Sequence, residues 1–315
     1  MKYLFFTILL IVLTISIFIG SADINIFSIK NYEYNIIVNY RIPRVLFSAV
    51  IGGILGFSGS IYQLVLKNPL ADALTTGASG VAALGAVISI TLGLHSYLMP
   101  IISFFFALIG IAFIYKISST DGHVHPISII LAGVILNIFA SAIISLLKYV
   151  FDESLASIIF FLMGGIHYIT WGQLGIIFSI FLILYYLVSK NSTSLDLLTL
   201  DEATATTTGI NVKYLRMKSF IISTLLIALA VSFTGIIGFV GLIVPHIARD
   251  IFGSSMCYNI YYSTIFGAIL LSISDTLSRI IIPSGAELPV GIITSIFGGI
   301  FFFYILNKKR QLSWF

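Results

Sequence analysis

Uninterrupted apolar runs dominate this chain, and two of them cover residues 3–20 and 174–188. Only 9% of the 315 residues are charged, whereas a soluble domain carries about 25%. A helix that spans a bilayer needs roughly 20 apolar residues. A membrane-spanning β-barrel would instead alternate polar and apolar residues, which these runs do not. We therefore predict an all-α integral membrane protein.

Polar, glycine and proline residues divide the apolar runs into about ten predicted transmembrane helices. These cover residues 3–20, 41–66, 74–93, 98–117, 127–148, 172–189, 217–236, 239–252, 260–281 and 288–306, with a short apolar piece at 155–166. The first run could be a cleaved signal peptide, but it is longer than a usual signal core, and we expect a retained helix. The length leaves no room for a soluble domain, so residues 1–315 are expected to form one transmembrane domain.

The basic residues predict how the chain is oriented. With the N-terminus inside, eleven Lys and Arg residues fall on the inner side and five on the outer side, as the positive-inside rule requires. Both termini are then cytoplasmic. The net charge of +4 follows from this orientation toward an anionic inner face, and it needs no nucleic-acid partner. The single cysteine, Cys257, excludes a cysteine-based metal cage.

The largest polar stretch, residues 190–218, falls on the inner side. Helix formers stand before Gly209, so we expect one or two short helices on the cytoplasmic surface. Such a surface could receive force from a partner, and an ordinary connecting loop is the alternative. The chain has no glycine-rich loop ending in Gly-Lys-Ser or Gly-Lys-Thr, so we do not expect it to hydrolyse ATP.

Three arginines are expected at one depth near the outer surface. Arg41 and Arg44 are three residues apart and share a helix face, and Arg279 ends the ninth predicted helix. Arginines are less expected outside than inside. We interpret them as an exposed ring that could pair with carboxylates on a docking protein. Anchors that snorkel to the interface are the alternative.

Polar and small residues within the predicted helices indicate where helices meet. Asp275 is a candidate for function because a charge inside the membrane is costly. Serines surround it and Arg279 follows at i+4, so we favour a structural hydrogen-bond node. Gly52 and Gly56 form a small-xxx-small pair, which is typical of close helix packing.

Two breaks fall on the inner side. Asn68 and Pro69 interrupt the chain, which indicates either a broken helix beside a pathway or a tight cytoplasmic turn. His125 and Pro126 close a polar loop that also contains His123. Two histidines could bind a metal ion, but with no third ligand in sight we favour a solvated loop and expect no metal site.

Several blocks of the chain, in this order, resemble the FecCD-type family of ABC importer permeases for iron–siderophores, haem and vitamin B12. The blocks span most of the chain from residue 41. They are Arg-Ile-Pro-Arg-Val-Leu at 41–46, Asn-Pro-Leu-Ala at 68–71, Leu-Ala-Gly at 131–133, Leu-Met-Gly-Gly at 162–165, Asp-Glu-Ala at 201–203, Gly-Ile-Asn-Val at 209–212, Gly-Phe-Val-Gly-Leu-Ile-Val-Pro-His-Ile-Ala-Arg at 238–249 and Glu-Leu-Pro-Val-Gly at 287–291.

The resemblance implies a type II ABC importer permease in the bacterial inner membrane, surrounded by lipid. Its implied partners are a second permease copy or paralogue, two cytoplasmic ATPase subunits that bind ATP and Mg, and an extracytoplasmic binding protein. This chain itself would hold no cofactor. In the family, the arginines that match Arg41, Arg44 and Arg279 face glutamates on the binding protein.

The resemblance also assigns inner residues. A segment at about 190–216 would couple to the ATPase, through Asp201, Glu202, Ala203, Thr204 and Gly209. The gate would lie near Asn68, Pro69, His125 and Pro126, although His125 and Pro126 stand where small hydroxyl residues are expected.

We expect an iron–siderophore as the cargo. A haem or vitamin B12 permease is the alternative within the family, and an ion-coupled secondary transporter is the alternative outside it.

Overall fold

The computed structural model describes residues 2–20, 31–95, 97–120, 123–199, 202–282 and 286–309. Nearly all of this part of the chain is helical, with one short antiparallel pair of strands. In chain order the elements are α1 (Lys2–Phe18), α2 (Asn31–Ile36), the π-helix η1 (Ile37–Arg41), α3 (Ile42–Val65), α4 (Ala78–Thr91), α5 (Leu98–Ser118), β1 (Ser119–Thr120), β2 (His123–Val124), α6 (Pro126–Val150), η2 (Asp152–Ser154), α7 (Leu155–Leu162), α8 (Trp171–Ser189), α9 (Ser192–Asp196), η3 (Leu197–Thr199), α10 (Glu202–Thr207), α11 (Val212–Thr234), α12 (Val240–Phe252), α13 (Met256–Ile280) and α14 (Val290–Lys309).

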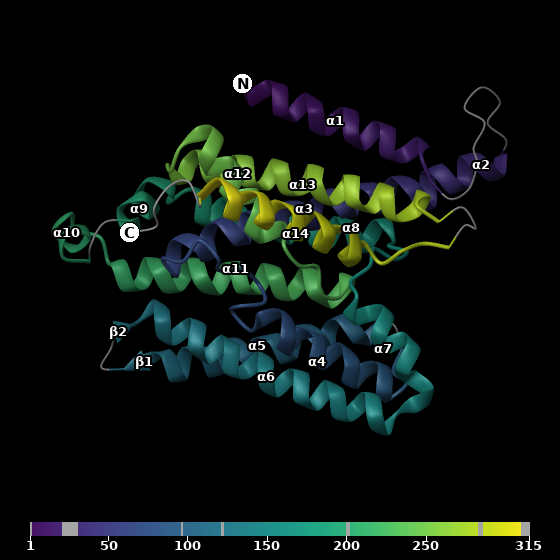
Figure 1. The fold of residues 1–315 in the computed structure, drawn as a ribbon, viewed down its shortest axis with the longest axis horizontal. Coiled ribbons are helices and arrows are strands. Elements are labelled where there is room, and N and C mark those ends of the chain that lie inside the picture. Colours follow the sequence, from purple (N-terminus) through teal and green to yellow (C-terminus); the bar gives the residue numbers. More distant parts are fainter. Residues whose placement is uncertain are drawn as a thin grey trace.

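The long helices run side by side along the longest axis of the molecule (Figure 1). One end carries α9, α10 and the β1–β2 pair, and the other end carries α2 and α7. Helices α4, α5, α6 and α7 form a group of their own below the rest in Figure 1, and α11 packs against both α3 and this group. The bundle therefore presents two ends, which carry different candidate sites.

The membrane character of the bundle agrees with the sequence. Six helices of the described residues are long and apolar enough to cross a membrane: Tyr32–Val65, Leu98–Ser118, Pro126–Val150, Trp171–Ser189, Val212–Thr234 and Met256–Ile280. Three shorter apolar helices coincide with the first, third and tenth predicted ones, and α12 coincides with the short eighth. The predicted all-α membrane architecture is confirmed.

Several predicted helix boundaries are wrong by four residues or more, including the start of α13, which lies at Met256 rather than at residue 260. Helix α4 begins at Ala78 rather than at residue 74, because the preceding residues form a run of turns. Helix α11 begins at Val212 rather than at residue 217, because the Asn211 side chain accepts a hydrogen bond from Tyr214 N at 2.9 Å and caps it.

Helices α3 and α13 form the centre of the bundle and touch through their backbones. A Cβ atom added at Gly52 would lie 2.2 Å from the carbonyl oxygen of Gly267, and one at Gly56 would lie 2.1 Å from that of Ser263. No side chain fits at such distances, so these positions permit the close approach of the two helices. The predicted role of the Gly52 and Gly56 pair in helix packing is confirmed.

Helix α1 is packed into this bundle against α13. The ring of Phe5 meets the rings of Tyr262 and Phe266 edge to face, with centroids 5.8 and 5.0 Å apart. Nearer the other end, Thr276 Oγ1 donates a hydrogen bond to Ser16 Oγ at 2.8 Å. These contacts pack α1 against α13.

Candidate functional site

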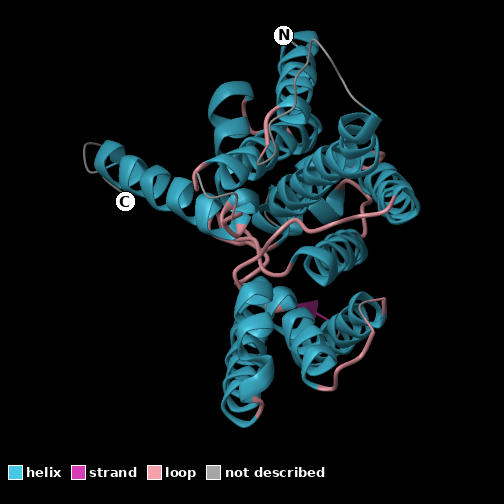
Figure 2. Cartoon of the chain, turned by 90° about the vertical axis from the view of Figure 1, so that its right-hand side faces the viewer, coloured by secondary structure: helices cyan, strands magenta, loops and turns pink. Residues whose placement is uncertain are grey.

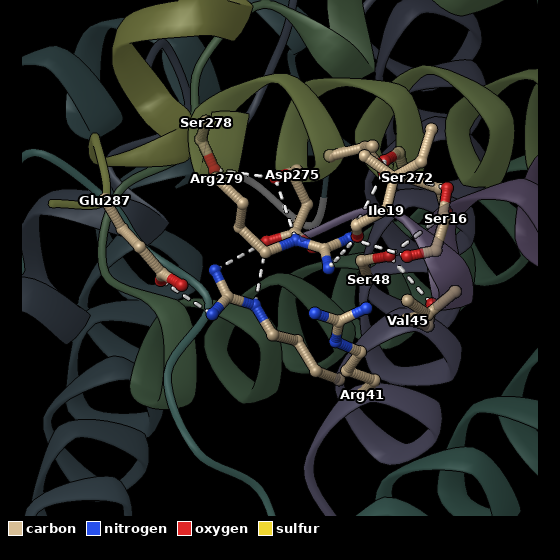
Figure 3. Close-up of polar contacts among 12 residues, drawn as sticks. Ser16, Ile19, Arg41, Val45, Ser48, Ser272, Asp275, Ser278, Arg279 and Glu287 are labelled. Carbon is tan, nitrogen blue, oxygen red and sulfur yellow. Dashed lines mark hydrogen bonds and ion pairs between the residues drawn. The ribbon is translucent and has the colours of Figure 1, made fainter. Parts of the chain in front are cut away.

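Three arginines and two carboxylates gather where α3, α13 and the segment before α14 meet (Figure 3). We call Arg41, Arg44, Asp275, Arg279 and Glu287 the arginine cluster. Arg44 Nη2 lies 3.0 Å from Asp275 Oδ1, and Arg44 Nη1 donates to Glu287 Oε2 at 2.7 Å. Asp275 is fully buried, whereas the Glu287 side chain is 36% exposed. The cluster thus has a buried centre and an accessible edge.

Pro43 explains the local shape of the chain that carries Arg41. Proline has no N–H group, and its ring crowds the carbonyl four residues earlier. Just before it the chain forms η1, in which Ile42 N bonds to Ile37 O. Such wider turns are rare and are frequent at functional sites. Arg41 ends this turn with its side chain buried.

Arg41 and Arg279 hold the end of α1. Their guanidinium groups donate to four backbone carbonyls at 2.8–3.2 Å, Arg41 to Ile17 and Phe18, and Arg279 to Ser16 and Ile19. The last carbonyls of a helix have no partner within the helix, and a cation suits the negative end of its dipole. The two arginines therefore cap α1.

Asp275 also faces Arg279 from the same helix. Arg279 Nε lies 3.1 Å from Asp275 Oδ2, but its hydrogen bond goes to the Asp275 backbone carbonyl at 3.3 Å. The contact with Oδ2 is therefore ionic rather than a directed hydrogen bond. The prediction of a structural node at Asp275 is confirmed.

The prediction of an exposed arginine ring is corrected in part. The structure brings Arg41, Arg44 and Arg279 together, but Arg41 and Arg279 are only 6% and 3% exposed. Buried guanidinium groups need acceptors, and the carbonyls of α1 and the carboxylate of Asp275 supply them. Arg44 keeps 16% of its side chain exposed. The role of the three in docking stays a prediction.

His167, in the loop before α8, was missed by the sequence analysis. Burial and the positive charge of Arg44 lower the pKa of His167, and Glu287 opposes this effect. The imidazole therefore stays neutral at neutral pH and adds no charge to the cluster. A single histidine in an apolar stretch carries no sequence signal that would have assigned it here.

Several loops cross between the two groups of helices (Figure 2). Gly165 N donates to Thr234 O at 2.8 Å, and Gly291 N donates to Gly164 O at 3.0 Å. Gly164 and Gly235 have φ values of +72° and +68°, a backbone conformation that favours glycine. Two of the sequence blocks that carry the family resemblance, at 162–165 and 287–291, therefore meet at one place, beside the turn at Gly235.

A cavity of about 540 Å³ lies beside this crossing. Its walls include Met163 after α7, Phe239 before α12, and Ile292 and Ser295 of α14. Among the described residues, no charged side chain lines it. Such a surface offers few fixed polar contacts to a molecule that passes over it.

The predicted break at Asn68 and Pro69 is present. Lys67 has a left-handed backbone with a φ of +47°. The Asn68 side chain then accepts a hydrogen bond from Leu70 N at 2.9 Å, which closes a turn. Asn68 is half-buried and Pro69 is exposed. Their part in a gate stays a prediction.

The chain after this break packs against α6. Asp72 is buried and accepts from Leu74 N and Thr75 N at 3.0 and 2.9 Å. Burial raises the pKa of Asp72, and these hydrogen bonds oppose the rise. A Cβ atom at Gly77 would lie 2.4 Å from Gly133 O on α6. The broken segment is therefore seated on a neighbouring helix.

His125 and Pro126 begin α6. His125 is the extended, exposed residue before the helix, and its carbonyl accepts from Ile129 N at 3.2 Å, while Pro126 takes a first-turn position. Within the described ranges, no group of three or more His, Cys, Asp or Glu side chains could hold a metal ion. The assignment of His125 and Pro126 to a gate stays a prediction.

The short helices predicted in the segment at about 190–216 are present, and their cytoplasmic location stays a prediction. They are α9 and α10, with η3 between them. Asp201 lies outside the described residues, and Glu202, Ala203 and Thr204 open α10. Gly209 has a φ of +80°, and a Cβ atom there would meet nothing within 4 Å. A glycine is therefore favoured at position 209 by the left-handed backbone conformation and not by close packing.

Asp196 ties this segment to α13. Its carboxylate accepts from Met256 N at 2.6 Å and from Ser255 Oγ at 3.2 Å, at the start of that helix. A negative charge stabilises a helix N-terminus. The same helix carries Asp275 and Arg279 at its far end. Helix α13 has 25 residues and is about 37 Å long, and it therefore connects the segment at 190–216 with the arginine cluster.

The fold is that of a multi-helix integral membrane protein with a distinct polar cluster at each end. Residues 8–308 match the FecCD transport family, and the chain belongs to that family. It is accordingly a permease subunit of an ABC importer in the inner membrane, and the ATPase is a separate subunit.

Known proteins with similar sequences and structures cover nearly the whole chain. The hemin transport system permease HmuU of Yersinia pestis is 31% identical over 96% of this chain and 95% of its own length. The Fe(3+)-citrate import system permease YfmD of Bacillus subtilis is 33% identical over 96% of this chain and 92% of its own length. A solved metal-chelate type ABC transporter in an inward-facing conformation has a TM-score of 0.90 at 29% identity, over 98% of both chains.

Proposed function

We propose that this chain forms the path for a ferric siderophore in an ATP-driven importer. The observation that carries the proposal is the crossing of three glycine loops beside an uncharged cavity of about 540 Å³. A polar chelate can pass such a wall without being held by a fixed ion pair. The related permeases named for hemin and for ferric citrate support an iron chelate as the cargo.

The orientation that we propose places the α9–α10 end in the cytoplasm. Lys67, Lys116 and Lys190 follow or end helices that run toward that end. Helix α1 begins toward the same end, and α14 runs toward it (Figure 1). Cationic residues favour the cytoplasmic side. Both termini would then be cytoplasmic, and the arginine cluster would face the outside.

The proposed mechanism is mechanical: movement of the ATPase subunits is transmitted to the helices, and this chain carries out no covalent chemistry. When the ATPase subunits bind ATP and close, they would push the segment at 190–216. Asp196 would pass this movement to the start of α13, which is packed on α3 along its length. The helices would then shift between two arrangements, and ATP would change which of them is populated.

The arginine cluster is the proposed docking site for a binding protein. Arg44 is its accessible cation, so Arg44→Gln should weaken docking while Glu287→Gln should not, because the latter frees Arg44 Nη1. Binding of the purified binding protein to the permease in nanodiscs would be measured at low and high salt. Salt should weaken docking to the wild type more than docking to Arg44→Gln, since exposed charge pairs are screened. Equal affinity and equal salt dependence would remove Arg44 from the docking site.

The experiment that tests the cargo is uptake in cells that lack this chain. Labelled ferric siderophores, hemin and cobalamin would be compared before and after the wild-type gene is returned. The proposal expects ferric siderophore uptake to be restored and the other two to be unchanged. Restored hemin or cobalamin uptake instead would reassign the cargo within the family. Restored uptake that persists without the ATPase subunits would favour an ion-coupled transporter.

A further inference from the structure

An apolar groove of about 500 Å³ lies on the side of the bundle where α1, α3, α8 and α13 face one another. Leu13 of α1 and Phe178 of α8 line its two sides, and Gly53 of α3 lies between them. None of the described residues that line it is charged. Water is disfavoured in such a space because it would find few hydrogen-bond partners.

Glycines keep the groove open. A Cβ atom at Gly175 would meet nothing within 4 Å, although this residue lines the groove. At Gly53, on α3, a Cβ atom would approach Thr264 Cγ2 at 3.3 Å and the Phe181 ring at 3.5 Å. Packed side chains therefore bound the groove at Gly53, whereas the space beside Gly175 on α8 is open.

The length of the groove favours an acyl chain as its occupant. Along α8 it extends from Trp171 to Phe181, ten residues or about 15 Å. The hydrocarbon core of a bilayer is about 30 Å thick, so the groove covers one leaflet and ends near the middle. A transmembrane helix from a partner would need the full thickness. An acyl chain fits the observed length.

The exposed end of the groove also suits a lipid. Trp171 stands there at the first residue of α8 and is exposed. Tryptophan is enriched where the membrane core meets the headgroups. The Thr170 side chain caps α8 beside it, and a Gln173 side chain completes the cap. This end is therefore the polar end of a groove whose other end is apolar.

We propose that this groove holds one acyl chain of a phospholipid from the leaflet at the α2 and α7 end of the bundle. The chain lies between α1 and α8 with its methyl end near Phe181, and the headgroup lies outside Trp171. This lipid is a resident ligand, distinct from the lipids that surround any membrane protein. The site does not depend on which cargo the permease carries.

Gly175→Leu is the variant that should fill the groove, and Gly172→Leu is its matched control. Both glycines lie on α8 with open space around an added Cβ atom, but only Gly175 lines the groove. Each protein would be placed in nanodiscs of phosphatidylethanolamine and phosphatidylglycerol with a trace of phosphatidylglycerol that carries a diazirine near the end of an acyl chain. Labelled peptides would be mapped after illumination.

In the wild type and in Gly172→Leu, label should concentrate on Leu13 and Phe178 over Ile183, an exposed residue of α8 outside the groove. In Gly175→Leu, labelling of Leu13 and Phe178 should fall severalfold while that of Ile183 is unchanged. Equal labelling of Phe178 and Ile183 in the wild type would overturn the proposal without any variant. Absence of label from Leu13 and Phe178 while Ile183 is labelled would show that lipid does not enter the groove, and would also overturn the proposal.

Discussion

Replacing Asp275 with alanine should lower the free energy of unfolding by about 3–5 kcal/mol, because it removes the counter-charge of two guanidinium groups, those of Arg44 and Arg279. Asp275 is fully buried and faces Arg44 at 3.0 Å and Arg279 at 3.1 Å. Buried guanidinium groups without a counter-charge are costly. The effect would be measured as the loss of monodisperse protein on heating in detergent.

Glu287→Gln is the matched control for this change. Glu287 pairs with the same Arg44, at 2.7 Å, but its side chain is 36% exposed. Exposed ion pairs contribute about 0–1 kcal/mol, so this variant should unfold near the wild-type temperature. If Asp275→Ala and Glu287→Gln lowered the unfolding temperature equally, the buried node would not be the element that holds α3, α13 and the end of α1 together.

Glu202→Lys should abolish import while leaving the protein folded. Glu202 opens α10, in the segment proposed to receive force from the ATPase. A reversed charge at this surface would repel the groups that the wild-type carboxylate attracts. The readouts are uptake in cells and ATPase activity of the purified importer, together with the unfolding temperature in detergent.

Glu153→Lys is the control for the charge change. Glu153 is exposed in η2, beside α7 at the opposite end of the bundle. It should leave coupled ATPase activity and uptake near wild type. Wild-type uptake through Glu202→Lys would remove the coupling role from α10.

The sequence was sufficient to predict the helices and much less informative about their polar contacts. Ten apolar segments, the packing glycines Gly52 and Gly56, and the break at Asn68 were all predictable, since each depends on local composition. Among the boundary errors, those at residues 74 and 217 arose where turns or a side-chain cap, rather than the length of the apolar run, set the start of the helix. Local patterns therefore describe this domain well along each helix.

The arginine cluster shows where local patterns stop being informative. Helix spacing predicted that Arg41 and Arg44 share one helix face. Arg279 was grouped with them because it was predicted at the same depth in the membrane. Their burial could not be predicted, because their acceptors are carbonyls at the end of α1, and no residue type marks a backbone acceptor. Asp196 was missed for a related reason. Its partner, the N–H group of Met256, is 60 residues away and carries no side-chain signal.

ATP-driven import is tested most directly by transport into proteoliposomes that hold the purified permease, its ATPase subunits and its binding protein. We expect labelled ferric siderophore to accumulate only with ATP and Mg, to be insensitive to an uncoupler, and to fail with Glu202→Lys. Accumulation that needs an ion gradient, proceeds without the ATPase subunits and survives Glu202→Lys would contradict this function and identify a secondary transporter.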